Sequence, residues 1–372
     1  MGDIAEFSKG SGYSKGDLIE SGTPIILYGR LYTKYETSIS EVDTYVEAKD
    51  GSVYSKGGEV IVPASGETAE DIARAATVDK SGVILGGDLN VVSPNEDINS
   101  AFLAISISHG NSQRELAKKA QGKSIVHIHN EEIKNLVVPF PTKAEQNKIV
   151  EYFSSLDNLI TLHQRKCEET KKLKKYMLQK MFPQNGKRVP EIRFVGFTED
   201  WEQRKLNDVV EFLDTMRKPL EGAKRIPGPY PYYGASGIVD YVDGYLFDEE
   251  LILLSEDGAN ITDRNYPVCF LASGKYWVNN HAHVLRTKQE NENNFICNSL
   301  ERKDYTQYNT GMAMPKLNKE TCKKIPISCP GFEEQKKIGD YFRRLDHLIT
   351  LHQRKYEELQ KIKKFMLQNM FI

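Results

Sequence analysis

Residues 145–182 read EQNKIVEYFSSLDNLITLHQRKCEETKKLKKYMLQKMF, and residues 334–371 read EQKKIGDYFRRLDHLITLHQRKYEELQKIKKFMLQNMF. The two stretches are identical at 26 of 38 positions, without a gap, at an offset of 189 residues. One copy lies in the middle of the chain and the other near its end. An internal repeat of this kind indicates that a structural unit is duplicated. The sequence therefore predicts that a unit of about half the chain occurs twice.

Each copy of the repeat is predicted to form one long amphipathic helix. Neither copy contains Pro, only the second contains a Gly, Gly339, and both are rich in Leu, Ile, Met, Lys, Glu and Gln, which favour helices. Apolar residues recur at alternating spacings of four and three, the pattern of a coiled-coil seam over about five heptads. The first copy supplies Ile149, Phe153, Leu156 and Ile160. Pro183 is expected to end the first helix, and 38 helical residues would span ~57 Å.

The composition is that of a globular protein with hydrophobic cores. The 372 residues allow two or more domains, and 39% of them are hydrophobic. No run of 18 apolar residues predicts a membrane span, and the opening MGDIAEFSKG has no apolar signal core. The five cysteines are odd in number and form no CxxC pair. We therefore expect a reduced, cytoplasmic protein without structural zinc or another bound metal.

The charge balance argues against a strongly basic nucleic-acid surface. The net charge is −2. Residues 1–142 carry 13 basic and 20 acidic groups, and residues 183–331 carry 19 and 21. Any DNA-binding surface must therefore be a local patch on an acidic globule.

The segments outside the helices are also related, although more faintly. GDIAEF (2–7) corresponds to NDVVEF (207–212), and VIVPASGETAEDI (60–72) resembles LILLSEDGANITD (251–263). QGKSIVHIHNEEIKNLVVPFPTKAEQ (121–146) pairs with TGMAMPKLNKETCKKIPISCPGFEEQ (310–335) at the offset of 189. Short runs of strand type lie between Gly, Pro, Asn and Asp turns. These runs are 24–28, 60–63, 83–85, 89–92, 251–254, 266–271, 276–278 and 281–285.

We predict an α+β fold in which two β-rich globules are separated by two long antiparallel coiled-coil helices, with a pseudo-twofold internal repeat. The expected domains are 1–142, 143–182, 183–331 and 332–372. Antiparallel helices would place the globules at opposite ends of a rod. Major-groove faces recur every ~34 Å along one side of a DNA duplex, so such a rod could hold two half-sites, and tying two binders together raises their affinity.

This layout resembles the specificity subunit of type I restriction-modification systems. The resemblance rests on the EQ-xx-I helix entries, the Leu-Asp-x-Leu-Ile cores and the Lys-rich helix tails. PYYGASGIVDYVDGYLFDEELILLSEDGAN (231–260), VNNHAHVL (278–285) and YGRLYTKYETSI (28–39) are similar to the target-recognition domains of that family. The resemblance covers nearly the whole chain, and the helical repeats are its most specific part.

The resemblance implies a non-catalytic reader of double-stranded DNA. Residues 1–142 and 183–331 would be target-recognition domains, each binding one half of a bipartite, asymmetric site. The two helices would set the spacer and dock two methyltransferase subunits, which a restriction subunit can join. Those partners would carry S-adenosylmethionine for DNA methylation, so the chain itself is expected to need no cofactor. In one departure, DWEQRKL (200–206) has no counterpart before Gly2, and the leading strand of the first globule is expected to be missing or supplied from elsewhere.

The candidates for DNA contact are polar and aromatic loop residues near basic ones. Arg and Lys bind phosphates and guanine edges, and Asn binds adenine. In the first globule the candidates are Arg30, Tyr32, Lys34, Tyr35, Ser65, Lys123 and Ser124. In the second they are Arg217, Lys218, Lys224, Arg225, Tyr232, Tyr233, Ser236, Asn260, Asn280 and His281.

Other chemistries find little support in the sequence. Gly122-Lys123-Ser124 ends like a phosphate-binding loop, but Ala117 replaces the required first Gly. His281 and His283 alternate on a predicted strand and would share a face. A metal site would need a third ligand, so base contact, phosphate contact and a structural role stay open. We assign no catalytic residue.

A second class of function remains open at this point. A coiled-coil scaffold that positions protein partners without reading DNA would have the same helices, and the acidic first half favours it slightly. An autonomous enzyme is disfavoured because no cofactor motif is present.

Overall fold

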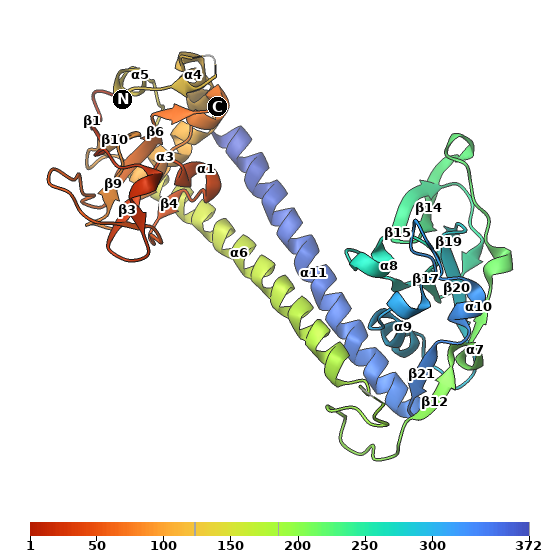
Figure 1. Cartoon of the computed structure of the whole chain (residues 1–372). Coiled ribbons are helices and arrows are strands. Elements are labelled where there is room, and N and C mark those ends of the chain that lie inside the picture. The colour runs from red at the N-terminus through yellow and green to blue at the C-terminus, as the bar shows by residue number, and fades with distance from the viewer. Residues whose placement is uncertain (123, 185, 372) are drawn as a thin grey trace. The chain divides into compact units, whose positions relative to one another are not determined.

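A computed structural model describes residues 1–122, 124–184 and 186–371 (Figure 1). The chain divides into two compact units. Unit 1 comprises Met1–His163 with Arg354–Ile372, and unit 2 comprises Gln164–Gln353. Both long helices cross this division, so each unit contains one globule and a part of each helix.

The two repeated segments form the long helices α6, Lys143–Lys180, and α11, Phe332–Met370 (Figure 1). Both begin a few residues before the Glu-Gln pairs that open the repeat, and acidic residues lie in both first turns, where they favour the helix dipole. The first helix ends at Lys180, three residues before Pro183. No helix in the described part of the chain is long and apolar enough to cross a membrane.

Within unit 1 the first part of α6 packs against the last part of α11. Phe153 and Leu156 of α6 form a buried cluster with Leu359 of α11, and the Phe153 ring lies 6.2 Å from that of Phe371. Asp157 of α6 binds Lys363 of α11. As the residue numbers increase along α6, the numbers of the contacting residues on α11 decrease, so the two segments run antiparallel. Burying a Phe or Leu side chain stabilises such a contact by ~1.5–3 kcal/mol.

Within unit 2 the remaining parts of the helices also run antiparallel. Lys174 Nζ lies 2.5 Å from Asp346 Oδ1, and the rings of Phe182 and Phe342 lie 6.0 Å apart. Phe342 and Phe182 are both fully buried in the largest core cluster of the unit. Aromatic pairs at this spacing add to the stability that burial provides.

The main sheet of unit 1 has the order β1-β10-β6-β8-β4. The strands are β1, Ala5–Lys9; β10, Leu89–Pro94; β6, Glu59–Pro63; β8, Ala76–Val78; and β4, Ser38–Ile39. Side chains alternate along a strand, and along β6 Val60 and Val62 face one core cluster while Ile61 faces another. The sheet is therefore buried on both faces, with α3, Ser100–Ser108, packed against β6 and β8.

The main sheet of unit 2 repeats this order as β13-β20-β17-β18. The strands are β13, Val210–Phe212; β20, Ala282–Thr287; β17, Leu251–Ser255; and β18, Cys269–Ala272. Ile252 and Leu254 of β17 face one core cluster and Leu253 faces the other. The helix α9, Asn293–Glu301, takes the place that α3 has in unit 1.

Each unit also has a second sheet, of four strands. In unit 1 the order is β2-β5-β3-β9, with β2, Leu18–Ile19; β5, Tyr45–Val46; β3, Thr23–Ile26; and β9, Ile84–Leu85. In unit 2 the order is β15-β14-β19-β16, with β15, Gly237–Val242; β14, Pro227–Gly234; β19, Lys275–Val278; and β16, Phe247–Asp248. All eight predicted strand runs overlap strands, although β3 ends at Ile26, before the predicted run does, and β18 begins only at Cys269 because Tyr266 lies in an exposed turn.

The remaining elements are short. Those of unit 1 are α1, Arg30–Thr33; β7, Ser65–Gly66; α2, Ala69–Ile72; α4, Gly110–Lys119; β11, Val126–His127; and α5, Asn130–Lys134, with a 3-10 turn at Lys15–Asp17. Those of unit 2 are β12, Glu202–Lys205; α7, Leu206–Val209; α8, Asn260–Asp263; α10, Lys319–Cys322; and β21, Pro326–Cys329, with 3-10 turns at Asp214–Met216, Gly222–Lys224 and Thr306–Tyr308. In the described part of unit 1 no strand corresponds to β12.

The backbone hydrogen bonds confirm that the globules are copies of one fold. The Leu317 amide donates to the Glu256 carbonyl at 2.7 Å, and in unit 1 the Ile128 amide donates to the Ala64 carbonyl at 3.1 Å. Leu317 and Ile128 are 189 residues apart. The repeat thus extends from the helices into the globules, and both units have a mixed helix-and-sheet architecture.

Candidate nucleic-acid interface

Three loops of unit 2 meet at one edge of its main sheet. They are residues 256–258 after β17, residues 279–281 before β20, and residues 310–316, and we call them the unit 2 loop cluster. The Glu256 amide donates to the His281 carbonyl at 2.9 Å, and the Gly258 amide donates to the Pro315 carbonyl at 3.1 Å. Backbone hydrogen bonds therefore hold the three loops as one surface.

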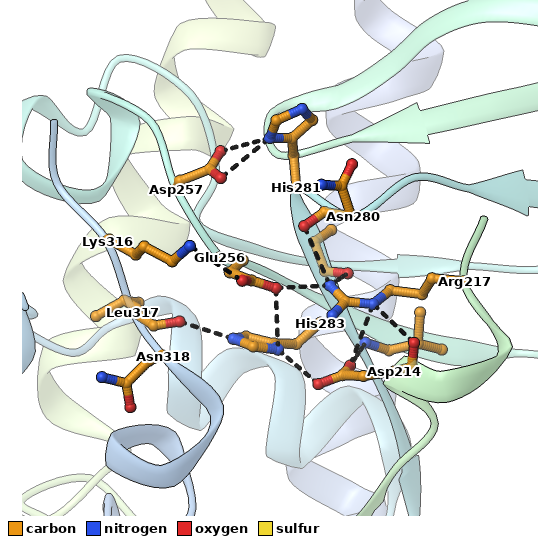
Figure 2. Close-up of polar contacts among 12 residues, drawn as sticks. Asp214, Arg217, Glu256, Asp257, Asn280, His281, His283, Lys316, Leu317 and Asn318 are labelled. Carbon is orange, nitrogen blue, oxygen red and sulfur yellow. Dashed lines mark hydrogen bonds and ion pairs between the residues drawn. The ribbon is translucent and has the colours of Figure 1, made fainter. Parts of the chain in front are cut away.

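A buried histidine lies beneath this surface (Figure 2). His283 of β20 is 1% exposed, with Nδ1 2.9 Å from Asp214 Oδ2 and Nε2 2.7 Å from the Leu317 carbonyl oxygen. A carbonyl oxygen accepts only, and so does an ionised carboxylate, so each ring nitrogen of His283 faces an acceptor. Burial opposes ionisation of Asp214, but the hydrogen bond from His283 and the charges of His283 and Arg217 outweigh it and lower the pKa of Asp214.

Arg217 completes this buried ionic cluster (Figure 2). Its guanidinium donates to Glu256 Oε2 at 2.7 Å and to the Ala282 carbonyl at 2.7 Å, and lies 3.6 Å from Asp214. The side chain is only 12% exposed. Arg217 and the His283 ring therefore face the carboxylates of Asp214 and Glu256. The prediction that Arg217 faces a DNA phosphate does not fit this placement, because its donors are used inside the unit, where they hold the loops in position.

The outer layer of the unit 2 loop cluster is polar and accessible. His281 Nδ1 lies 2.8 Å from Asp257 Oδ1, and the other ring nitrogen points away from that carboxylate (Figure 2). Asn280 is exposed, and Lys316 is exposed with Nζ 3.5 Å from Glu256. These three side chains offer the amide, imidazole and ammonium groups that bind base edges and phosphates.

The two histidines do not share a face as predicted. His281 lies in the loop before β20, which begins at Ala282, whereas His283 is inside the strand and buried. His283 is therefore a structural residue, and only His281 is available to a ligand. Among the described residues no three His, Cys, Asp or Glu side chains are grouped to hold a metal ion.

Several other candidates in unit 2 lie in its interior. The hydroxyl of the buried Tyr232 accepts a hydrogen bond from the Leu220 amide at 2.9 Å. Asn260 is also buried, and its amide donates to Ser255 Oγ at 2.9 Å. Tyr233 packs edge-on against the ring of Tyr276. These side chains shape the second sheet and the turn after β17, so a direct DNA contact by Tyr232 or Asn260 does not fit the structure.

The basic candidates of unit 2 do not form the single patch that their spacing suggested. Lys218 and Lys224 are exposed, and Lys224 pairs with Glu221 at 2.8 Å. Arg225 is half-buried, lies over the Tyr232 ring and binds Asp240 at 3.1 Å. Ser236 is exposed on the turn between β14 and β15. Of the predicted contacts, Lys218, Lys224, Ser236, Asn280 and His281 therefore remain accessible.

Unit 1 pairs its predicted basic residues with acids. Arg30, 8% exposed, binds Asp43 at 2.6 Å and Glu36 at 2.7 Å. Lys34 binds the other oxygen of Asp43 at 2.8 Å. Hydrogen bonds from Lys34 and then Arg30 lower the pKa of Asp43 to about 2. Arg30 and Lys34 line an open cavity of ≈ 600 Å³, and Lys34, which is exposed, is the more accessible of the two to a phosphate.

Two of the predicted tyrosines form hydrogen bonds with backbone carbonyls of the unit 1 loops. The Tyr32 hydroxyl donates to the Ser65 carbonyl at 2.8 Å, and the Tyr35 hydroxyl donates to the Ala75 carbonyl at 3.1 Å. Ser65 Oγ lies 3.1 Å from His127 Nδ1 across the β7–β11 pair. Ser124 is exposed on the adjoining loop, and Lys123 lies outside the described residues.

The structure adds residues that we did not select from the sequence. They are Asp257 and Lys316, which form a bridge between two loops of the unit 2 cluster, and His127, which forms the matching pair in unit 1 with the predicted residue Ser65. His127 and Lys316 are 189 residues apart. This offset was a signal that could have identified both residues as equivalent loop positions.

Comparisons with known proteins agree with this architecture. The family model for the type I restriction modification DNA specificity domain matches residues 1–172 and 198–361. A Haemophilus influenzae protein assigned as a type I restriction enzyme specificity subunit is 35% identical over 150 residues, which cover 40% of this chain and 38% of that protein. The match thus spans less than half of that relative's length.

Two further relatives match over longer stretches. The type I restriction enzyme MjaVIII specificity subunit of Methanocaldococcus jannaschii is 23% identical over 323 residues, which cover 77% of this chain and 72% of that protein. The crystal structure of the type I restriction-modification S subunit from M. genitalium covers 100% of this chain and 94% of that chain, with a TM-score of 0.66 and 16% identity, and so shares the fold. Because the family model matches both halves, the chain belongs to the family of type I restriction-modification DNA specificity subunits.

Proposed function

We propose that the chain reads a bipartite, asymmetric DNA site, with one half-site bound by each unit. The observation that carries this proposal is the combination of one repeated scaffold with two different sets of exposed side chains. The unit 2 loop cluster presents Asn280, His281 and Lys316, whereas the equivalent loops of unit 1 present Ser65 and His127. Side chains of different hydrogen-bonding type select different bases, so two such units would read two unlike half-sites.

We further propose that the long helices serve as an antiparallel coiled-coil spacer and dock two methyltransferase subunits. Each unit leaves an apolar helix face exposed. The unit 1 helix face consists of Leu159, Ile362 and Phe365, and the unit 2 helix face consists of Leu348, Leu173 and Tyr176. Each residue of one face is 189 positions from a residue of the other. Two equivalent apolar faces fit two copies of one partner, since exposed apolar patches mark protein contacts.

The chain itself would be non-catalytic in this proposal. The methyltransferase subunits would hold S-adenosylmethionine and transfer the methyl group, and restriction subunits would join through them. The ionisable groups of the unit 2 loop cluster are paired with each other or held by the backbone. Such paired groups hold a surface in shape, which suits recognition better than proton transfer.

A scaffold that never contacts DNA remains the competing function. The net charge of −2 and the pairing of Arg30, Lys34 and Arg217 with acids favour it. Exposed lysines next to the loops, Lys218 and Lys316, favour DNA contact instead. A binding measurement with the assembled complex distinguishes the DNA reader from the scaffold.

The test begins with the adenine methylation pattern of the host genome, mapped with and without this gene. DNA reading predicts a split motif that disappears when the gene is deleted. The chain is then purified with its methyltransferase partner and mixed with a duplex that carries the motif. A shift of this duplex, but not of a scrambled one, is expected. A complex that assembles and shifts neither duplex would establish the scaffold function.

A further inference from the structure

Both units present a large apolar side chain at the same loop position. Ile125 is 58% exposed in unit 1, and Met314 is 60% exposed in unit 2. The two residues are 189 positions apart, the offset of the helical repeat. The residues just before them differ, Ser124 in one and Ala313 in the other. A single exposed apolar residue is normal, but the same exposure at one position of two diverged loops points to a shared use.

The loops that carry these residues have the same backbone construction. The Gln121 amide donates to the His127 carbonyl at 3.0 Å, and the Thr310 amide donates to the Lys316 carbonyl at 2.8 Å. Each loop is thus closed at its base by an equivalent hydrogen bond, with the apolar residue between the two ends.

Each loop also depends on a glycine beneath its tip. A Cβ atom on Gly122 would lie 1.9 Å from the Ile125 carbonyl oxygen, and one on Gly311 would lie 1.8 Å from the Met314 carbonyl oxygen. No side chain fits at either position, so both glycines let the loop fold tightly against its own tip. In unit 2 the Asn309 carboxamide oxygen accepts from the Gly311 amide at 2.9 Å and stiffens the turn further.

The surroundings of each tip are polar and suit nucleic acid. Residues 310–316 belong to the unit 2 loop cluster, next to Asn280 and His281, and the exposed Lys316 closes the loop. In unit 1, Ser124 and His127 flank Ile125 and are exposed. Hydrogen-bonding and cationic groups around one projecting apolar side chain are the arrangement by which proteins insert Ile or Met between base steps.

We propose that Ile125 and Met314 are apolar wedges, one for each half-site, that enter the DNA between adjacent base pairs and unstack them. The inference rests on the proposed DNA-reading function and adds a deformation of the duplex to it. A wedge contacts base faces, which every base has, and therefore stays apolar while the neighbouring side chains that select bases diverge. The unstacked step would also contribute selectivity, because the energy of unstacking depends on its sequence.

The test uses the chain in complex with its methyltransferase partner and duplexes in which 2-aminopurine replaces one adenine at a time. The fluorescence of 2-aminopurine rises when its neighbours unstack. The wild-type complex is expected to raise the fluorescence at one step in each half-site. Met314→Ala should abolish the rise in one half-site only, and Ile125→Ala should abolish it in the other. Each variant should bind about 10-fold more weakly, because it loses one buried apolar side chain.

Two controls keep the result interpretable. Val195→Ala changes an apolar residue of unit 2 that lies outside the loop cluster and is even more exposed than the two wedges, and it should leave fluorescence and affinity unchanged. Because the exposed Met312 could replace Met314, the double variant Met312→Ala/Met314→Ala is measured as well. Unchanged thermal midpoints and partner binding confirm that the variants fold.

The outcomes separate the wedge from the DNA-reading function. The wedge proposal is wrong if the wild-type complex binds its duplex without a fluorescence rise in either half-site, or if the alanine variants retain the rise. Neither result contradicts the proposed DNA-reading function. If the variants lose the methyltransferase subunits, the loops contact protein and the wedge is overturned. If the wild-type complex binds no duplex at all, the proposed function itself fails.

Discussion

Lys174 Nζ lies 2.5 Å from Asp346 Oδ1, an ion pair between α6 and α11 in unit 2, and Lys363 and Asp157 form the equivalent pair in unit 1. All four residues obey the 189-residue offset. In unit 1, Asp157 and Lys363 border hollows lined by residues of the globule. In unit 1 this pair therefore marks the side of the helices that faces the globule.

The apolar helix faces lie on the other side. Leu159 and Phe365 are each two residues beyond Asp157 and Lys363, which places them roughly 200° around their helices. The same spacing separates Leu348 from Asp346 in unit 2. Repeat symmetry thus gives each unit one helix surface toward its own globule and one free apolar surface.

We predict that Phe365→Asp removes one methyltransferase subunit from the complex and that Tyr176→Asp removes the other. A carboxylate in a desolvated apolar contact loses its hydration without gaining a partner. Native mass spectrometry should show a complex lighter by one methyltransferase subunit for each single variant and by two for the double variant.

Lys175→Asp serves as the control for the change of charge, because Lys175 is an exposed polar residue next to Tyr176 on α6. Its complex should keep both subunits. Retention of both subunits by Phe365→Asp and Tyr176→Asp would show that the partner binds elsewhere.

A second prediction concerns the buried ionic cluster of unit 2. Glu256→Gln removes the carboxylate that faces Arg217 and lies 3.7 Å from His283, and leaves the buried Arg217 guanidinium without its closest anionic partner. Breaking such a cluster costs ~3–5 kcal/mol. Amide hydrogen exchange should accelerate in residues 256–258, 279–281 and 310–316, and binding of one half-site should weaken while the other is unchanged.

Glu249→Gln provides the matched control, since Glu249 pairs with Arg286 on the surface of the same unit. Exposed pairs contribute ~0–1 kcal/mol, so its exchange pattern should equal that of the wild type. Equal exchange in the Glu256→Gln variant would mean that the cluster does not hold the loops.

The third prediction is a pH dependence of stability in unit 1. Burial, and then the charges of Lys363 and Arg74, lower the pKa of His109 from 6.5 to about 4. The folded chain therefore binds this proton less readily than the unfolded chain, so stability is complete above pH 6.5 and declines as the pH falls toward 4. His109→Gln should reduce this decline, measured as the urea midpoint by circular dichroism between pH 4 and 7.

The exposed His347 supplies the control, and His347→Gln should retain the pH dependence of the wild type. If His109→Gln loses stability between pH 6.5 and 4 as steeply as the wild type, His109 is not the group responsible.

The sequence predicted the helices and the strands well because their signals are local. The seam of α6 and α11 follows from apolar spacing along one segment, and a helix of that length needs no distant partner to be recognised. The strand runs likewise lie between turn residues a few positions away. Such patterns can be read directly from neighbours in the chain.

The sequence predicted the site less well because exposure depends on distant partners. Arg217 lies beside Lys218 in the chain, yet the first is enclosed and the second is exposed, because Glu256, 39 positions away, binds only Arg217. Asn260 and Asn280 are the same residue type, but only Asn260 finds Ser255 within reach. A basic or amide residue near aromatic ones therefore predicts a DNA contact and a structural hydrogen bond equally well.

The last prediction separates these two roles by salt dependence. Lys316 is exposed beside Asn280 and His281 and is the cation best placed to meet a phosphate at the unit 2 loop cluster. Lys316→Ala should reduce the slope of log K against log[salt] by up to ~0.9, the contribution of one phosphate contact. Arg217→Ala should instead lower the stability of unit 2 with little change in slope, because its guanidinium is enclosed by Glu256 and Asp214.

Lys275→Ala controls for the loss of a positive charge. Lys275 is an exposed lysine of β19 that lies over the Tyr245 ring, and its replacement should leave the slope as it is. An unchanged slope for Lys316→Ala, with the wild-type complex still bound to DNA, would place the phosphates away from this loop and leave Lys218 and Lys224 as the next cations to test.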